Sequence, residues 1–306
     1  MAQHHALGDL AASRLANVTK TPPQFDKITP RWLVRLLDWK PLEAGMLRVN
    51  RVADKPVEVA CALKEEKTIP ETYVDYEENP REYTLSAIST ILNVHTRASD
   101  LFSNPFDQIK EQLRLTIEQV KERQEDELIN NSDYGLLLNV PKSQRIKTRK
   151  GAPTPDDLDE LIAKVWKEPS FFLVHPQAIA AFGRECTRRG VPPPTVTLFG
   201  APFLTWRGLP LVPCDKLHVK DAEKGHHGTS DILLLRVGEK KQGIVGLFQP
   251  GLPGEQTPGL SVRFMGINNK SLASYLISLY CSAAILTDDA IAVLENVEIG
   301  NYHDYK

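Results

Sequence analysis

The side chains of this sequence most able to do chemistry are its thiols and imidazoles. Cys186 or Cys214 with His175 could supply the nucleophile and general base of a Cys–His hydrolase. No signature places a histidine beside either cysteine, and a histidine directly before Pro176, at a helix start, is more often a structural cap. No two of the four cysteines are closely spaced, which indicates free thiols in a reducing compartment rather than disulfides or a zinc site.

Other catalytic, metal or phosphate motifs are missing from the sequence. It contains no GxGxxG after a strand, no phosphate loop, no GxSxG and no HExxH. His226 and His227 lie in a glycine-rich loop without a third ligand nearby, so we interpret this loop as exposed rather than metal-binding. The neighbouring acids of 125–127 point apart on a helix and predict a solvated face. We therefore expect no enzyme, and no cofactor or metal in the chain itself.

Length and composition predict a soluble globular chain. The 306 residues carry a net charge of −2, which does not fit a chain built to bind nucleic acid. The first 30 residues have no apolar signal core, so we expect a cytoplasmic protein. The most apolar run, 271–287, is shorter than the ~20 residues that cross a bilayer, and it predicts a buried helix over 271–286 and no membrane partner.

The first 85 residues predict two extended pieces of opposite charge. Residues 1–42 predict an arm, whose first 40 residues hold six Lys or Arg against three Asp, with a short apolar helix after Thr29 as cap. Strands at 46–52 and 57–63 predict a hairpin, because apolar residues alternate in the second. The segment 54–82 holds nine Asp or Glu against four Lys or Arg, so it is acidic.

The middle of the chain predicts one long helix and a basic loop. Residues 104–130 carry an apolar stripe at helical spacing, with Asn104 as the expected cap. Five cations follow within 142–150 without an anion. We interpret this segment as a solvated loop or a partner for an acidic segment, and less readily as a phosphate-binding patch.

The second half predicts an α/β domain. Helices are expected from Thr154, with Pro155 in the first turn, and from Pro176 to Gly190. Short apolar runs divided by glycine and proline predict strands at 196–199, 203–206, 209–212, 232–237, 244–248 and 260–265. A last segment over 290–297 closes the chain.

These parts together resemble the major capsid proteins of tailed phages, and the sequence is similar to the family 2A encapsulin shell proteins. The likeness is carried by ITPRWLVRLLDW (28–39), EAGMLRVNRV (43–52), YVDYEENPREYTL (73–85), GAPTPDDLDE (151–160), PSFFLVHPQAIAAFGRE (169–185), LFGAPFLTWRGLPLVP (198–213) and VGLFQPGLPGEQTPGLSVRFMGIN (245–268). The resemblance implies an α+β capsid fold. Its parts would be an N-terminal arm (1–42), an extended hairpin or E-loop (43–85), a P-domain with the spine helix (86–150), an A-domain (151–258), and returning C-terminal strands and helix (259–306).

The resemblance also implies a function. Encapsulins self-assemble into closed icosahedral shells, here of the smallest (T=1) kind, around a cargo enzyme. For family 2A the expected cargo is a cysteine desulfurase, which would carry its own pyridoxal phosphate and serve sulfur metabolism or storage. A phage major capsid protein is the alternative within this fold, and the Cys–His hydrolase is the alternative from another class.

Two sets of site residues follow from the resemblance. The arm of this fold reaches under an adjacent subunit, so we expect inter-subunit contacts from Trp32, Leu33, Leu36 and Trp39, with the first three buried only in the assembly. Deleting residues 1–40 would then leave monomers or aggregates. Opposite charges on arm and hairpin would guide assembly.

The A-domain would surround the five-fold axes. We therefore expect a pore lined by Arg188, Arg189, Gly190, Val191, Pro192, Pro193 and Pro194, with 220–228 as the other candidate. Cations at this place would favour anionic or neutral solutes.

Overall fold

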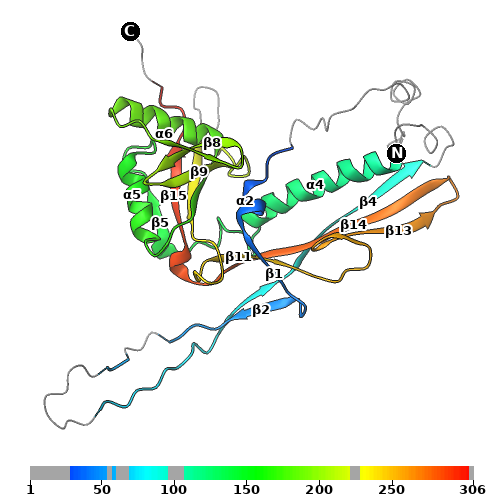
Figure 1. Cartoon of the computed structure of the whole chain (residues 1–306), viewed down its shortest axis with the longest axis horizontal. Coiled ribbons are helices and arrows are strands. Elements are labelled where there is room, and N and C mark those ends of the chain that lie inside the picture. Colours follow the sequence, from blue (N-terminus) through cyan, green and yellow to red (C-terminus); the bar gives the residue numbers. More distant parts are fainter. Residues whose placement is uncertain (1–27, 54–56, 60–68, 96–106, 221–227, 303–306) are drawn as a thin grey trace.

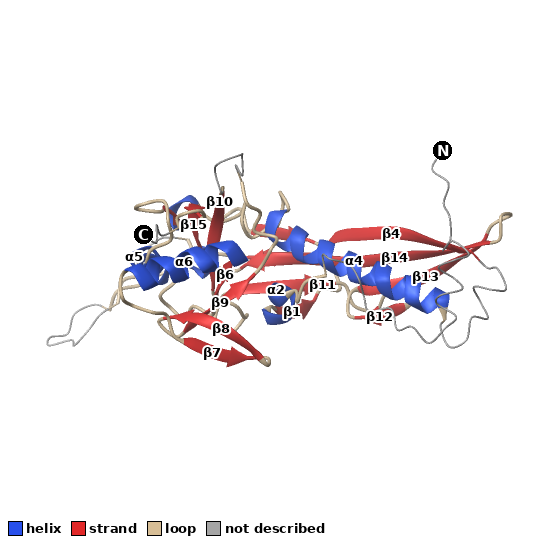
Figure 2. Cartoon of the chain, turned by 90° about the horizontal axis from the view of Figure 1, so that it is seen from above, coloured by secondary structure: helices blue, strands red, loops and turns tan. Residues whose placement is uncertain are grey.

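A computed structural model describes residues 28–53, 57–59, 69–95, 107–220 and 228–302. One half of the molecule is a rounded α/β body, and the other half is a long sheet with a helix along it (Figures 1 and 2). A thin two-stranded hairpin projects from the junction of the two halves (Figure 1). None of the helices in these ranges is both long and apolar enough to cross a membrane.

The α/β body is built on a seven-stranded sheet of order β5-β15-β10-β6-β9-β8-β7. Its central strands are almost wholly buried, as their near-continuous apolar sequences require. The strands are β5 (Arg145–Lys147), β6 (Phe171–Val174), β7 (Thr195–Leu198), β8 (Ala201–Trp206), β9 (Leu209–Pro213), β10 (Thr229–Leu235) and β15 (Ile291–Glu298). Four of the six strands expected from 196 to 265, and the last segment, are confirmed in this sheet as β7, β8, β9, β10 and β15; the other two lie in the second sheet.

Two capped helices, α5 (Pro155–Lys164) and α6 (Pro176–Arg188), lie side by side on this body (Figure 1). The Thr154 hydroxyl accepts from the Asp157 N–H at 3.2 Å, and the Asp157 carboxylate accepts from the Thr154 N–H at 3.0 Å. This reciprocal capping box confirms the predicted start of α5. At the start of α6, Nδ1 of His175 accepts from the Gln177 N–H at 3.2 Å, which is the expected cap.

The long half is a six-stranded sheet of order β1-β11-β14-β13-β12, in which β4 also pairs with β14. The strands are β1 (Asp38–Pro41), β4 (Ser86–His95), β11 (Ile244–Phe248), β12 (Glu255–Thr257), β13 (Leu260–Ile267) and β14 (Leu272–Ile285). The helix predicted over 271–286 is therefore wrong. A continuous apolar run fits a buried helix or a buried strand equally, and here β4, β11 and β13 supply hydrogen-bonding partners for a strand.

The spine helix α4 (Gln108–Asn130) lies along this sheet (Figure 2). It begins four residues later than predicted, because the Asp107 carboxylate accepts from the Lys110 N–H and caps it. The predicted cap, Asn104, lies outside the described residues. The apolar stripe is confirmed, since Val120 packs in a cluster with Ile277 and Leu279.

The extended hairpin differs most from prediction. Strand β2 (Met46–Val49) pairs with β3 (Arg81–Thr84), not with 57–63, and one further bridge joins Val52 to Tyr76. Residues 57–59 form no strand, and 60–63 lie outside the described residues. The alternating pattern needs a face to bury, yet Val59 is 80% exposed. The loop beyond the paired strands is thus much longer than expected.

Candidate assembly surfaces

The short helix α2 (Trp32–Leu36) belongs to the arm, and the residue before it is bound to the spine helix. The backbone N–H and hydroxyl of Thr29 donate to the two carboxylate oxygens of Glu122, at 2.9 and 3.0 Å. Thr29 is therefore not the predicted cap of α2. Arg31 contacts both Glu118, at 2.6 Å, and Glu122, at 3.0 Å. Carboxylates four residues apart on one helix face thus hold the arm.

The arm also supplies core side chains to its own chain. Trp32 is 8% exposed and Leu33 is fully buried, and the Trp32 ring contacts Phe199 and Phe203 of the α/β body. The expectation that Trp32 and Leu33 are covered only in an assembly is therefore wrong. Deleting residues 1–40 would remove part of the core, so it would disturb folding as well as assembly.

Leu36 and Trp39 remain half-buried in the single chain. The Trp39 indole N–H donates to the Val34 carbonyl at 2.8 Å, which fixes the ring over β11 close to Gly246. Any contact of these two side chains with a neighbouring subunit stays a prediction.

A buried carboxylate lies where arm, spine helix and α/β body meet. Glu125 is 1% exposed and accepts from the Leu33 N–H at 2.9 Å, so the prediction of a solvated face is wrong for it. Burial raises its pKa to about 7. Nearby, Lys216 joins Glu122 at 3.0 Å to Asp215 at 2.8 Å. Sequence reasoning missed this junction, although the spacing of acids at 118, 122 and 125 opposite a basic arm was a usable signal.

One group in the described ranges could in principle hold a metal ion. Ligand atoms of Glu125, Cys214 and Asp215 lie within 4.8 Å of one another. However, Glu125 is engaged by the Leu33 N–H and Asp215 by the Lys216 ammonium. A cation already neutralises this group, so its donors fit a structural junction better than a metal site.

The candidate thiol nucleophiles are poorly placed for catalysis. Cys186 and Cys214 are buried, and burial raises the pKa of Cys186 to about 11 and that of Cys214 further. Burial lowers the pKa of His175, whose Nδ1 already caps α6. A thiol nucleophile needs a lowered pKa, which is the reverse of what these surroundings produce.

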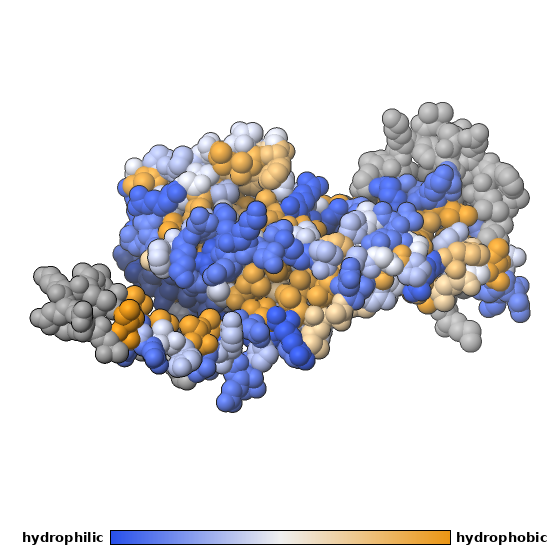
Figure 3. Space-filling model, turned by 60° about the horizontal axis from the view of Figure 1, so that its bottom comes forward, coloured by the Kyte–Doolittle hydropathy of each residue, from blue (hydrophilic) through white to orange (hydrophobic). Residues whose placement is uncertain are grey.

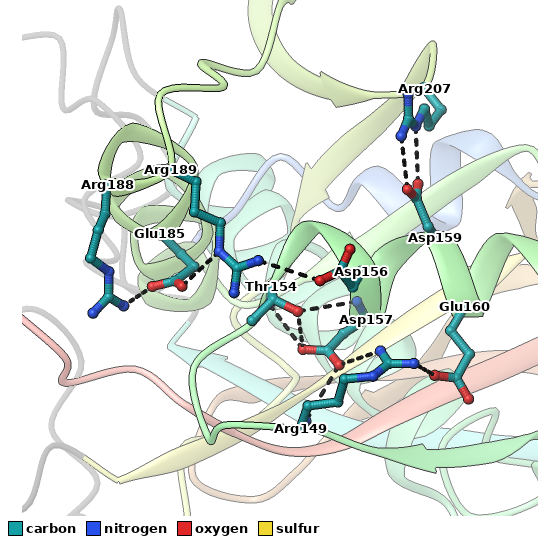
Figure 4. Close-up of polar contacts among 10 residues, drawn as sticks. All are labelled: Arg149, Thr154, Asp156, Asp157, Asp159, Glu160, Glu185, Arg188, Arg189 and Arg207. Atoms are coloured by element: carbon teal, nitrogen blue, oxygen red, sulfur yellow. Dashed lines mark hydrogen bonds and ion pairs between the residues drawn. The ribbon is translucent and has the colours of Figure 1, made fainter.

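The predicted pore residues lie at the carboxyl end of α6 (Figure 4). Both Arg188 and Arg189 contact the buried carboxylate of Glu185, and Arg189 also reaches Asp156 at 3.3 Å. The predicted segment then continues through the exposed Val191 and the three prolines. The structure therefore brings the predicted residues together at one end of the body. Whether they line a pore stays a prediction.

Two arginines of the basic loop, residues 142–150, form ion pairs within their own chain. Arg145 pairs with Glu295 at 2.8 Å, and Arg149 contacts Asp157 at 3.0 Å and Glu160 at 2.5 Å (Figure 4). In the second pore candidate, Lys220 pairs with Asp231 at 2.6 Å, and residues 221–227, including both histidines, lie outside the described residues.

The hairpin carries a run of exposed apolar side chains. Figure 3 shows apolar side chains along this projection. Its exposed large side chains are Val52, Val57, Val59, Ile69, Tyr73, Val74 and Tyr76. A two-stranded ribbon with such side chains has little core of its own, and an exposed apolar run of this kind is typical of a surface that contacts another molecule.

A body of this kind with an arm, a spine helix and a projecting hairpin defines a capsid-like fold. Solved structures bear out this class. The capsid of a native GTA particle matches 94% of the chain with a TM-score of 0.59 at 12% identity, and that of Microbacterium phage Oxtober96 matches 94% with 0.56 at 14%. These likenesses show the fold alone.

Closer relatives show the family. A family model for type 2A encapsulin shell proteins, SrpI-like, matches residues 43–301. The type 2A encapsulin shell protein SrpI of Synechococcus elongatus is 66% identical over 98% of this chain and 97% of its own length. A cryo-EM structure of the holo-SrpI encapsulin complex of that organism covers 99% of this chain and 100% of its own, with TM-score 0.84 and 64% identity. The chain therefore belongs to the type 2A encapsulin shell proteins, and the phage capsid alternative is set aside.

Proposed function

We propose that copies of this chain close into a T=1 icosahedral shell around a cysteine desulfurase, in the cytoplasm, in a role in sulfur metabolism or storage. The observation that carries self-assembly is the exposed apolar hairpin. Tyr73 is 82% exposed and Tyr76 65% exposed in the single chain. An assembled relative with nearly the same fold supports a second copy as the cover.

The cargo proposal rests on family membership, and a direct experiment tests it. Shells purified from the native cells would be opened and their contents identified by mass spectrometry and by the absorbance of pyridoxal phosphate. We expect a cysteine desulfurase in an amount that rises with the number of shells. Shells that consistently contain a different enzyme would contradict the cargo proposal and leave the shell proposal intact.

The shell protein itself is proposed to be non-catalytic, with no cofactor and no nucleic-acid or membrane partner. Its buried thiols support this, because Cys186 and Cys214 both have raised pKa values. Shells of the Cys186→Ala or Cys214→Ala variant, purified without cargo, should show the same negligible enzymatic turnover as cargo-free shells of the unaltered protein. A turnover that one of these substitutions abolishes would contradict the proposal.

Solute entry is proposed to pass Arg188 and Arg189 and the segment 190–194. Replacing both arginines with glutamine should slow cysteine turnover by enclosed cargo, because it leaves the Glu185 charge uncompensated near the entry. Free cargo, measured beside the shells, is the control. Equal cysteine turnover in the unaltered shells and in the shells with both arginines replaced would remove support for solute entry at this place.

A further inference from the structure

The 3₁₀ turn η2 (Asp288–Ala290) joins the two sheets of the molecule. It follows β14 of the long sheet and precedes β15 of the α/β body, and it lies at the base of the projecting hairpin (Figure 1). Two consecutive carboxylates, Asp288 and Asp289, lie in this turn. Sequence reasoning passed over them, because two acids at a turn are common.

Asp288 holds both strands of the hairpin. Its two oxygens accept from the two terminal nitrogens of Arg51, each at 2.7 Å, and from Arg81 at 2.8 Å. Arg51 follows β2 and Arg81 begins β3, so one carboxylate joins the two sides of the ribbon. A bidentate arginine–carboxylate pair fixes orientation as well as distance. The Arg51 side chain is 20% exposed and that of Asp288 is 41% exposed, so solvent screens this pair in part.

Asp289 holds the same turn to the α/β body. It accepts from Arg236 at 2.6 Å and from Lys167 at 2.8 Å. The Arg236 side chain is 1% exposed and also donates to the Thr287 hydroxyl at 2.7 Å. Two adjacent carboxylates thus connect the hairpin to the body through a single turn.

Both carboxylates remain ionised near neutral pH. The hydrogen bond from Arg51 lowers the pKa of Asp288. Partial burial alone would raise the pKa of Asp289, but its bonds to Arg236, Lys167 and Thr287 hold the pKa well below the usual range. The four cationic partners of the pair therefore face charged carboxylates.

A further polar contact joins the base of the hairpin to the long sheet. The Tyr83 hydroxyl donates to the Ile285 carbonyl at 2.9 Å, beside a small apolar cluster. Beyond it, the ribbon continues through the Glu77 N–H, which donates to the Arg51 carbonyl at 2.8 Å. A ribbon fixed through only one of its two strands could rotate about that contact. Here Tyr83 fixes the β3 side and Arg51 fixes the β2 side, so the two contacts together define the direction of the hairpin.

We propose that Asp288 and Asp289 are positioning residues that set the direction of the hairpin relative to both sheets, and that this direction selects a single shell geometry. The second half of this statement rests on the proposed shell function. The first half concerns the subunit alone and can be tested without a shell.

Asp288→Asn tests shell geometry, since it removes the charge and keeps the shape. Glu82→Gln is the matched control, because Glu82 forms an exposed pair with Arg48 on the same hairpin. We expect one size class of particles from the unaltered chain and from the control. From Asp288→Asn we expect mixed sizes and open fragments in more than half of the particles by electron microscopy. One unchanged size class from Asp288→Asn would overturn the proposal.

Two further measurements keep the test decisive. If Asp288→Asn does not fold, Arg51→Lys decides, because it keeps the charge and loses the bidentate geometry; a uniform size class from it would overturn the proposal. For subunits that form no shell, spin labels at the exposed positions Tyr73 and Trp166 report the hairpin direction. We expect Asp288→Asn at least to double the spread of distances between the labels, and an unchanged spread would refute the positioning role.

Discussion

The α/β body and the extended hairpin represent two ways of completing a fold. In the body, β6 is buried along its whole length, and β10 is buried from Ser230 onward. In the hairpin, Val59 and Tyr73 are at least 80% exposed. The body is stabilised by its own apolar residues, whereas the hairpin beyond its paired base has apolar residues without a core. The difference separates a part of the subunit that folds on its own core from a part that, in the proposed shell, other copies would complete.

Charged side chains show the same contrast. In the body, Arg149 and Arg189 find carboxylates within their own domain (Figure 4). The described part of the hairpin instead presents exposed acids, including Glu71, Glu77 and Glu78. Ion pairs within the body tie adjacent helices together, and exposed acids can instead guide encounters with another subunit.

Removing the hairpin tip should give the largest effect. Val49 and Arg81 are paired across the ladder, so an Asn-Gly turn can replace residues 50–80 without changing the register. We expect a folded subunit that forms no shells, because the surface that other copies cover is gone. Circular dichroism and electron microscopy would check this, and complete shells from the shortened chain would contradict it.

Substituting one aromatic residue in the body and one in the hairpin should affect different properties of the subunit. Phe172→Ala in β6 should lower the free energy of unfolding of the dissociated subunit by about 3–5 kcal/mol, because it leaves a cavity in the core. Tyr73→Ala should change it by less than about 0.5 kcal/mol and should weaken assembly instead. Urea unfolding and particle yield measure the two effects. Equal losses of subunit stability would show that the two regions do not differ in this way.

Glu125→Gln tests the junction between the arm and the two halves. Its folded pKa is about 7 against an ordinary value of 4.5. The stabilising effect of its proton is thus complete below about pH 4.5 and is lost as the pH rises to about 7. At pH 8 we expect Glu125→Gln to be more stable than the unaltered chain by about 1–3 kcal/mol, with the gain vanishing near pH 4. Thermal unfolding at both pH values checks this, and an equal difference at both would contradict it.

Thr154→Ala should give the smallest effect. It removes one half of the capping box at the start of α5 and should cost about 1 kcal/mol, since the N–H of Asp157 loses its side-chain partner. Shell formation should be unaffected, because the cap lies within the body. The control is Thr154→Ser, which keeps the hydroxyl. Loss of shells at unchanged subunit stability would place this helix end in an interface.

Sequence reasoning succeeded where local chemistry decides structure. The caps at Thr154 and His175 and the short strands between glycine and proline follow from neighbouring residues, so they were predicted correctly. Prediction from the sequence failed where residues far away in the chain determine the secondary structure or the strand pairing. Strand β14 is a strand because other strands pair with it, and β2 pairs with β3 across a loop that no local pattern reveals.

The candidate site was predictable to a lesser degree. The resemblance located the arm and the hairpin, but only the structure shows that Leu33 is buried within its own chain. The role of Glu125 depends on burial at a three-way junction, and that of Asp288 on two arginines far away in the sequence. No spacing in the sequence encodes such contacts.

In the proposed shell, the hairpin of this subunit is completed by another copy. Cryo-electron microscopy of the purified protein decides whether that is so. We predict closed, hollow particles of one size, in which Tyr73 and Tyr76 lose their exposure against a neighbouring subunit. A particle population limited to the 34.3 kDa monomer or its dimer, or shells in which both tyrosines stay exposed to solvent, would contradict the claim.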